Sequence, residues 1–172
     1  MRSFYLKMKY RIVELSNLSG SEAVFYSIIT ESESDTVFEK FLLENQFNFG
    51  DEVIDIVNRL RVIANDTGAR EQFFKLKEGK LGDLVCALYD NPDKKLRLYC
   101  IRFGKQTVLL GGGGEKPPDI QSWQEDEKLS EEANLMIKVS KDIHQKILDK
   151  EIAWSEDGFE LIGDLDFTDY DE

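Results

Sequence analysis

The sequence has few of the residues from which disulfide scaffolds and zinc sites are built. Among its 172 residues there are two cysteines, Cys86 and Cys100, and one histidine, His144. Two cysteines are too few for a disulfide framework, and with a single histidine they suggest no zinc site. We therefore expect no metal, no cofactor and a reducing compartment, with both cysteines as small reduced core residues and His144 in a structural role.

Long hydrophobic runs are also missing. No apolar stretch approaches the roughly 20 residues that a transmembrane helix needs. The first residues, MRSFYLKMKYRIVEL, contain no apolar region followed by a small-residue cleavage site, so no signal peptide is predicted. Hydrophobic residues nevertheless make up 41% of the chain, which is ordinary for a globular protein. The sequence therefore predicts a cytoplasmic protein without a membrane partner.

Positive charge is scarce overall and unevenly distributed. The net charge of −12 argues against general nucleic-acid binding. Residues 155–172 hold eight acids and no Lys or Arg, whereas residues 69–118 hold ten Lys or Arg against six Asp or Glu, a local charge of +4. The pattern predicts one locally basic domain at residues 1–152 and an acidic C-terminal tail at residues 153–172.

Hydrophobic periodicity predicts an α+β domain. Segments rich in Val, Ile, Tyr and Phe predict strands at residues 9–16, 23–30, 84–89, 96–103 and 106–110. A period of 3.6 predicts helices at residues 34–46, 51–65 and 123–150. We expect Ser34 or Asp35 to cap the first helix and Gly68 to end the second. The order indicates an N-terminal hairpin, two helices, a three-stranded antiparallel meander and a final helix.

The two faces of the predicted meander differ in character. Because side chains alternate along a strand, one face should be wholly apolar and meet the helices; it consists of Leu84, Cys86, Leu88, Leu96, Leu98 and Cys100. The opposite face places Arg97 between Tyr89 and Tyr99, which is typical of an anion site with stacking surfaces. The structural alternative is an arginine that lies over apolar neighbours and pairs with a helix carboxylate.

Four consecutive glycines, Gly111 to Gly114, follow the last predicted strand in TVLLGGGGEKPP. The run is not a P-loop, because Glu115-Lys116-Pro117-Pro118 follows where Gly-Lys-Ser/Thr is required. A backbone anion nest stays an alternative. The interpretation that we favour is a flexible rim at the end of the sheet, from which Lys116 can swing over a bound phosphate.

The run FFKLKEGKLGDLVCALYDNPDKKLRLYCIRFGKQTVLLGGGGEKPP resembles the core of the RelE/ParE superfamily of toxins, and among them the HigB-like, phage-derived branch. The matching pieces are Lys75-Leu76, Leu81-Gly82-Asp83, Arg97-Leu98-Tyr99, and Val108-Leu109-Leu110 followed by Lys116. The resemblance implies a RelE-like fold, in which helices pack on an antiparallel sheet.

The resemblance also implies a metal-independent endoribonuclease that cleaves mRNA on the ribosome through attack of the ribose 2′-OH on its neighbouring phosphate. Arg97 and Lys116 take the places of the family's strand arginine and loop lysine and would stabilise phosphorane charge. Tyr99 would complete the catalytic set. The candidate RNA-binding residues are Tyr89, Lys75, Arg102 and Lys105.

Two further expectations concern partners. A toxin of this type would be neutralised by a cognate antitoxin, expected to be a helix-turn-helix protein. The alternative is a non-catalytic binding or co-repressor module on the same fold, acting through a protein partner. For the acidic tail, the composition predicts either a disordered segment or one that docks over the basic face, with carboxylates near Arg97 in place of RNA phosphates.

Overall fold

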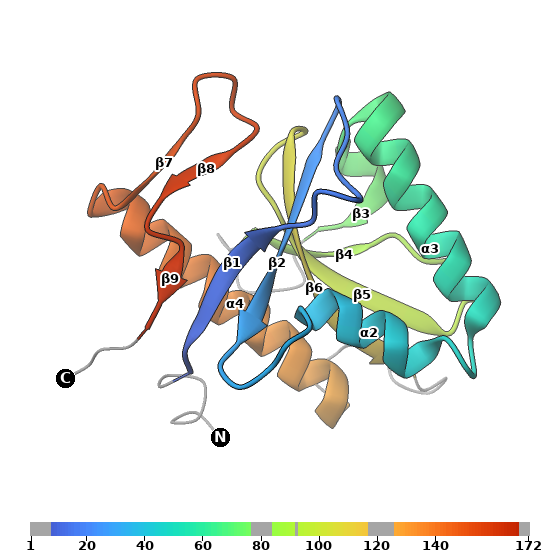
Figure 1. Cartoon of the computed structure of the whole chain (residues 1–172). Coiled ribbons are helices and arrows are strands. Elements are labelled where there is room, and N and C mark those ends of the chain that lie inside the picture. Colours follow the sequence, from blue (N-terminus) through green and yellow to red (C-terminus); the bar gives the residue numbers. More distant parts are fainter. Residues whose placement is uncertain (1–7, 77–83, 92, 117–125, 169–172) are drawn as a thin grey trace.

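The computed structural model describes residues 8–76, 84–91, 93–116 and 126–168. The chain has a mixed α+β fold, in which a large and mostly antiparallel sheet carries helices on both faces (Figure 1). Leu81, Gly82, Asp83, Pro117 and Pro118, which belong to the family resemblance, lie outside the described residues. In the described part of the chain, no helix is long and apolar enough to cross a membrane.

The sheet joins the predicted hairpin to the predicted meander. Its strands lie in the order β3-β4-β5-β6-β2-β1-β9, and a separate two-stranded sheet pairs β7 with β8. Among the strands of the described residues, only β2 and β6 run parallel; the other pairs are antiparallel. The strand bounds are β1 Tyr10–Glu14, β2 Val24–Thr30, β3 Phe74–Lys75, β4 Val85–Leu88, β5 Leu96–Arg102, β6 Thr107–Glu115, β7 Ile152–Trp154, β8 Leu161–Gly163 and β9 Asp166–Phe167.

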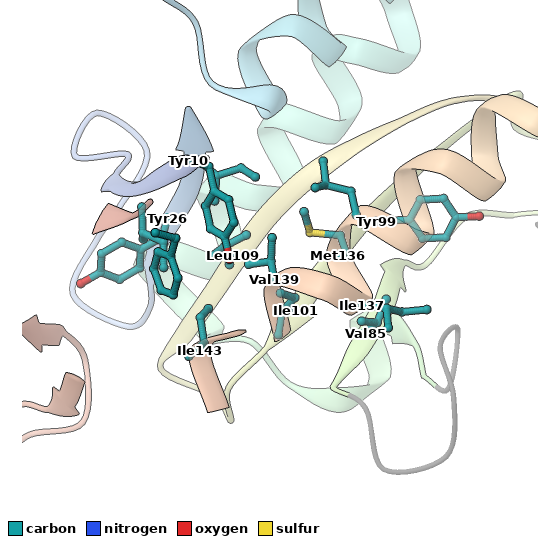
Figure 2. Close-up of a cluster of buried hydrophobic side chains, with 14 of the residues drawn as sticks. Tyr10, Tyr26, Val85, Tyr99, Ile101, Leu109, Met136, Ile137, Val139 and Ile143 are labelled. Carbon is teal, nitrogen blue, oxygen red and sulfur yellow. The ribbon is translucent and has the colours of Figure 1, made fainter. Parts of the chain in front are cut away.

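Helices cover both faces of the sheet. The α2–α3 face is covered by α2, Val37–Asn45, and by α3, Gly50–Val62, which continues as a π-helical turn over Ile63–Thr67. A 3₁₀ turn over Glu71–Phe73 then leads into β3. The α4 face is covered by α4, Glu127–Leu148, and Figure 2 shows part of its buried cluster. The meander's apolar face packs under α2 and α3 as predicted, except that Leu84 is 48% exposed.

The sequence signals placed the ends of the first two helices to within one or two residues. Thr36 caps α2, because its hydroxyl accepts from the Glu39 N–H and the Glu39 carboxylate accepts from the Thr36 N–H. The expected caps Ser34 and Asp35 are therefore wrong by one or two residues. Gly68 ends the second helical segment with φ of 76°, a conformation that glycine tolerates best.

Cys86 and Cys100 face each other across β4 and β5 as buried free thiols, 3.9 Å apart.

The four glycines lie inside a strand and not in a flexible loop, so that interpretation is wrong. β6 continues through Gly114 to Glu115, and Leu98 pairs with Gly113 whereas Cys100 pairs with Leu110. Tyr99 thus faces two residues, which defines a β-bulge. The bulge turns Gly111 and Gly112 toward α4, where added Cβ atoms would lie 2.6 Å from Met136 Sδ and 2.5 Å from Glu132 Oε1. The missing side chains let α4 approach this strand closely.

The acidic C-terminal segment is part of the fold up to residue 168. β9 extends the sheet beside β1, and the Phe167 ring stacks on Tyr10 with centroids 4.8 Å apart. Lys146 of α4 donates to the backbone oxygen of Asp164, at 3.0 Å. The predicted disorder of the tail is therefore wrong for residues 153–168. Docking near Arg97 is wrong for the same residues, because they pack along β1 and against the first residue of β6, Thr107.

Candidate functional site

Three basic side chains converge on one carboxylate at an end of the sheet. The Asp90 carboxylate lies 2.5 Å from Lys116 Nζ, 3.7 Å from Arg97 Nε and 3.7 Å from Lys75 Nζ. We call Asp90, Lys75, Arg97 and Lys116 the Asp90 cluster. Its formal charge is +2, since three cations surround a single anion.

Strand register explains why residues so distant in sequence meet here. Asp90 lies two residues beyond the end of β4, and Arg97 is the second residue of the neighbouring β5. Arg97 pairs with Gly114 across to β6, so Lys116 emerges just past it, and the Lys116 N–H donates to the Lys95 carbonyl at 2.7 Å. Lys75 belongs to β3 on the other side of β4. Four adjacent strands therefore contribute to one cluster.

The cluster is largely shielded from solvent. The side chains of Asp90, Arg97 and Lys116 are 4%, 11% and 17% exposed, while Lys75 is 36% exposed. A buried charge is tolerated when it is paired, and removal of its partner leaves an uncompensated charge. Asp90 therefore holds the three cations together.

Asp90 was not identified from the sequence. It directly precedes the turn motif Asn91-Pro92-Asp93, next to which an acidic residue is unremarkable. Pro92 lies outside the described residues. Strand register carried the missing information. An acid just beyond a buried strand, opposite the start of a strand that bears Arg97, has to meet that arginine or be left buried without a partner.

The two candidate tyrosines have different environments. Tyr99 is fully buried in the α4-face cluster, and in Figure 2 its hydroxyl points outward from the edge of that cluster. Tyr89 is 48% exposed, and its carbonyl accepts from Arg59 Nη1 at 2.6 Å. Tyr89 directly precedes Asp90 in the chain and lines a pocket on the α3 side together with Arg59 and Ile63. Tyr99 therefore offers no exposed stacking surface, because α4 covers the face on which it lies.

The other candidate cations do not join the cluster. Arg102 ends β5, where its Nε donates to the Ala69 carbonyl at 2.7 Å and its Nη1 lies 3.8 Å from Glu71 Oε2. Arg102 lies five positions after Arg97 along the strand, a distance of about 17 Å. Lys105 follows in the turn to β6. His144 is exposed on α4. An RNA-binding role for Arg102 and Lys105 stays a prediction, at a second location.

Comparisons with protein-family models, with curated proteins and with solved structures found no match to this chain. Function therefore has to be inferred from the chain's own residues and from their geometry.

Proposed function

We propose that the chain is an mRNA-cleaving toxin with a RelE-like fold, of the HigB-like type, which acts in the cytoplasm on ribosome-bound mRNA and is neutralised by a cognate helix-turn-helix antitoxin. One observation carries the proposal. Two residues of the family resemblance, Arg97 and Lys116, lie beside each other on the Asp90 carboxylate, with Lys75 as a third cation.

The proposed reaction is an internal transesterification of RNA. The ribose 2′-oxygen forms a bond to the adjacent phosphorus, the bond from phosphorus to the 5′-oxygen breaks, and the product is a 2′,3′-cyclic phosphate. The 2′-OH loses its proton and the leaving oxygen gains one, so no oxidant and no metal is required. Charge builds on the phosphorane oxygens as the reaction proceeds, and preorganised cations lower the barrier by stabilising that charge.

The cluster's residues divide the work by their chemistry. The planar guanidinium of Arg97 suits two phosphate oxygens at once, and the ammonium of Lys116 acts as a compact point charge. Asp90 positions both of them before RNA arrives. Tyr89, which is half exposed and directly precedes Asp90, would stack on a base of the bound RNA. In this proposal Tyr99 supports the site from the buried α4 face.

The test is induced expression of the wild-type chain and of three variants in a bacterial host without the antitoxin. We expect growth arrest with wild type, relief by Arg97→Ala and Lys116→Ala, and no relief by Lys141→Ala, which removes an exposed cation of α4. In a translation extract, the first two variants should cleave mRNA at least about 100-fold more slowly. Absence of both arrest and cleavage with wild type contradicts the proposal.

A second candidate function is a non-catalytic binding module. The observation that favours it is that the candidate catalytic groups are already paired and buried, with Lys116 on Asp90 and Tyr99 inside the core. Under this function the Asp90 cluster is structural. Arg97→Ala would then lower the free energy of unfolding while wild type leaves mRNA intact and still binds the product of the neighbouring gene.

A further inference from the structure

A cleft of about 650 Å³ lies on the described part of the chain, away from the atoms of the Asp90 cluster. It opens at the C-terminal ends of β2 and β6, with α2 on one side and the first turns of α4 on the other. Gly112 and Gly113 contribute to its lining with backbone alone. The volume falls within the range of roughly 300 to 1,000 Å³ that is typical of small-molecule sites.

The topology of the sheet accounts for the position of this cleft. β2 and β6 form the parallel pair, so their C-terminal ends lie at the same edge. β2 leads into α2 on the α2–α3 face, whereas α4, the next element described after β6, lies on the α4 face (Figure 1). Where neighbouring parallel strands lead to opposite faces, a crevice forms between the connections, and such crevices are preferred ligand sites in open sheets.

Local contacts hold the crevice open. β2 pairs with β6 only from Val24 to Tyr26, and at the next residue the Ser27 hydroxyl donates to the Leu110 carbonyl at 2.7 Å. The Phe38 N–H of α2 donates to the same hydroxyl at 3.4 Å. This side chain replaces the next backbone pairing, and the strands separate beyond it. A Cβ on Gly112 would enter the space beside Glu132.

The lining has a charge pattern opposite to that of the Asp90 cluster. Its five carboxylates outnumber its three lysines and leave a formal charge of −2; the carboxylates belong to Glu31, Glu33, Glu44, Glu131 and Glu132. Lys128 lies 3.0 Å from Glu132 and 3.4 Å from Glu44, and Lys40 lies 3.5 Å from Glu33. Apolar side chains of Val37, Phe41 and Leu135 line the cleft between these charges.

Carboxylates separated by apolar walls complement a chain of ammonium groups joined by methylene segments. A ligand ammonium can share a glutamate with Lys40 or Lys128, or replace either lysine there, and the methylenes can lie against the half-buried Val37. We propose that the cleft binds a small aliphatic polyamine. The proposal does not depend on RNA cleavage, because it uses none of the four residues of the Asp90 cluster.

The test is isothermal titration calorimetry of the full chain with spermidine at about 0.15 M salt. We expect saturable binding at one site, and no binding of the same ligand with both terminal amines acetylated. Glu132→Gln should weaken binding about tenfold or more, because a desolvated charge partner is lost. Gly112→Ala should weaken it as well, because the added Cβ would lie 2.5 Å from Glu132 Oε1 and displace that carboxylate. Glu156→Gln, which removes an equal charge from an exposed position, should change affinity less than about twofold.

The two glutamine variants distinguish specific binding in the cleft from nonspecific attraction of a cation to an acidic chain. Equal losses for Glu132→Gln and Glu156→Gln, or no binding with wild type, overturn the proposal. So does binding of a capped leucine-lysine-leucine peptide without binding of spermidine, because that result assigns the cleft to a protein partner. Thermal melts of each variant show whether a loss of binding reflects a loss of folded protein. Glu44→Gln provides a second variant, with a smaller expected loss.

Discussion

The Asp90 cluster and the cleft between α2 and α4 both place charged side chains beside β6, but with opposite net charge. Gly112 and Gly113 of β6 line the cleft, and Lys116, just past the strand's end, belongs to the cluster. In the cluster three cations surround one carboxylate, whereas in the cleft two carboxylates hold Lys128. In each group one side chain has the opposite sign to its neighbours: the Asp90 side chain is 4% exposed, whereas that of Lys128 is 48% exposed. Burial therefore predicts that the cluster is coupled to folding much more strongly than the cleft.

The largest expected effect is that of Asp90→Asn. The variant keeps the shape of the side chain but removes the carboxylate charge that Lys75, Arg97 and Lys116 share. We expect a loss of about 3 to 5 kcal/mol in the free energy of unfolding, measured by urea denaturation. A loss below about 1 kcal/mol would show that solvent compensates the cations, and the contrast with the cleft would disappear.

Gly113→Ala should come next, because it tests the strand that borders both sites. Its Cβ would collide with the backbone carbonyl of Arg97, which has no side-chain freedom to move aside. We expect a loss of about 1 to 3 kcal/mol in the free energy of unfolding. The matched control is Gly50→Ala at the start of α3, where a Cβ meets nothing within 4 Å. The control should be neutral or stabilising by up to about 1 kcal/mol.

Much of the fold, but less of the site, could be predicted from the sequence. Alternation along the meander predicted that Cys86 and Cys100 share one buried face, because a wholly apolar face is stable only when it is covered. The glycines of β6 were misread because glycine is disfavoured in strands, and the close approach of α4 that requires them is a tertiary contact. The terminal acids were misread as a solvated tail because Lys146, which binds Asp164, lies on a different element.

The candidate site shows the same limit. Arg97 and Lys116 were predicted as a pair from the family resemblance, and the structure places both on Asp90. Asp90 itself was missed because its role depends on strand pairing, which no local pattern of residues encodes. Arg102 was grouped with Arg97 because both lie on one short strand, yet they occupy its opposite ends. A sequence pattern predicts which face of a strand carries a residue more reliably than it predicts which residues of neighbouring strands meet at one end of the sheet.

Glu132→Gln tests the buried side of the cleft through its pH dependence. Burial raises the pKa of Glu132 more than the attraction of Lys128 lowers it. The folded chain therefore prefers protonated Glu132, and this contribution is present below the ordinary Glu pKa of about 4.3 and is lost as the pH rises through the raised pKa. Glutamine mimics the protonated form and does not titrate. The variant should thus gain stability relative to wild type as the pH rises from about 4.3 through the raised pKa. A constant difference in unfolding free energy across that range would contradict it.

The smallest effect is expected for Glu44→Gln, on the exposed side of the same ion-pair group. Its carboxylate lies 3.4 Å from Lys128 Nζ, but the two side chains are 49% and 48% exposed, so water and salt screen their attraction. Lys128 also keeps Glu132, which together with Glu44 raises the Lys128 pKa although burial alone would lower it. We expect a change below about 0.5 kcal/mol in the free energy of unfolding, which disappears in about 1 M salt. Urea denaturation at low and high salt measures both numbers. A loss comparable to that of Asp90→Asn would mean that the contribution of an ion pair to the free energy of unfolding does not depend on its burial.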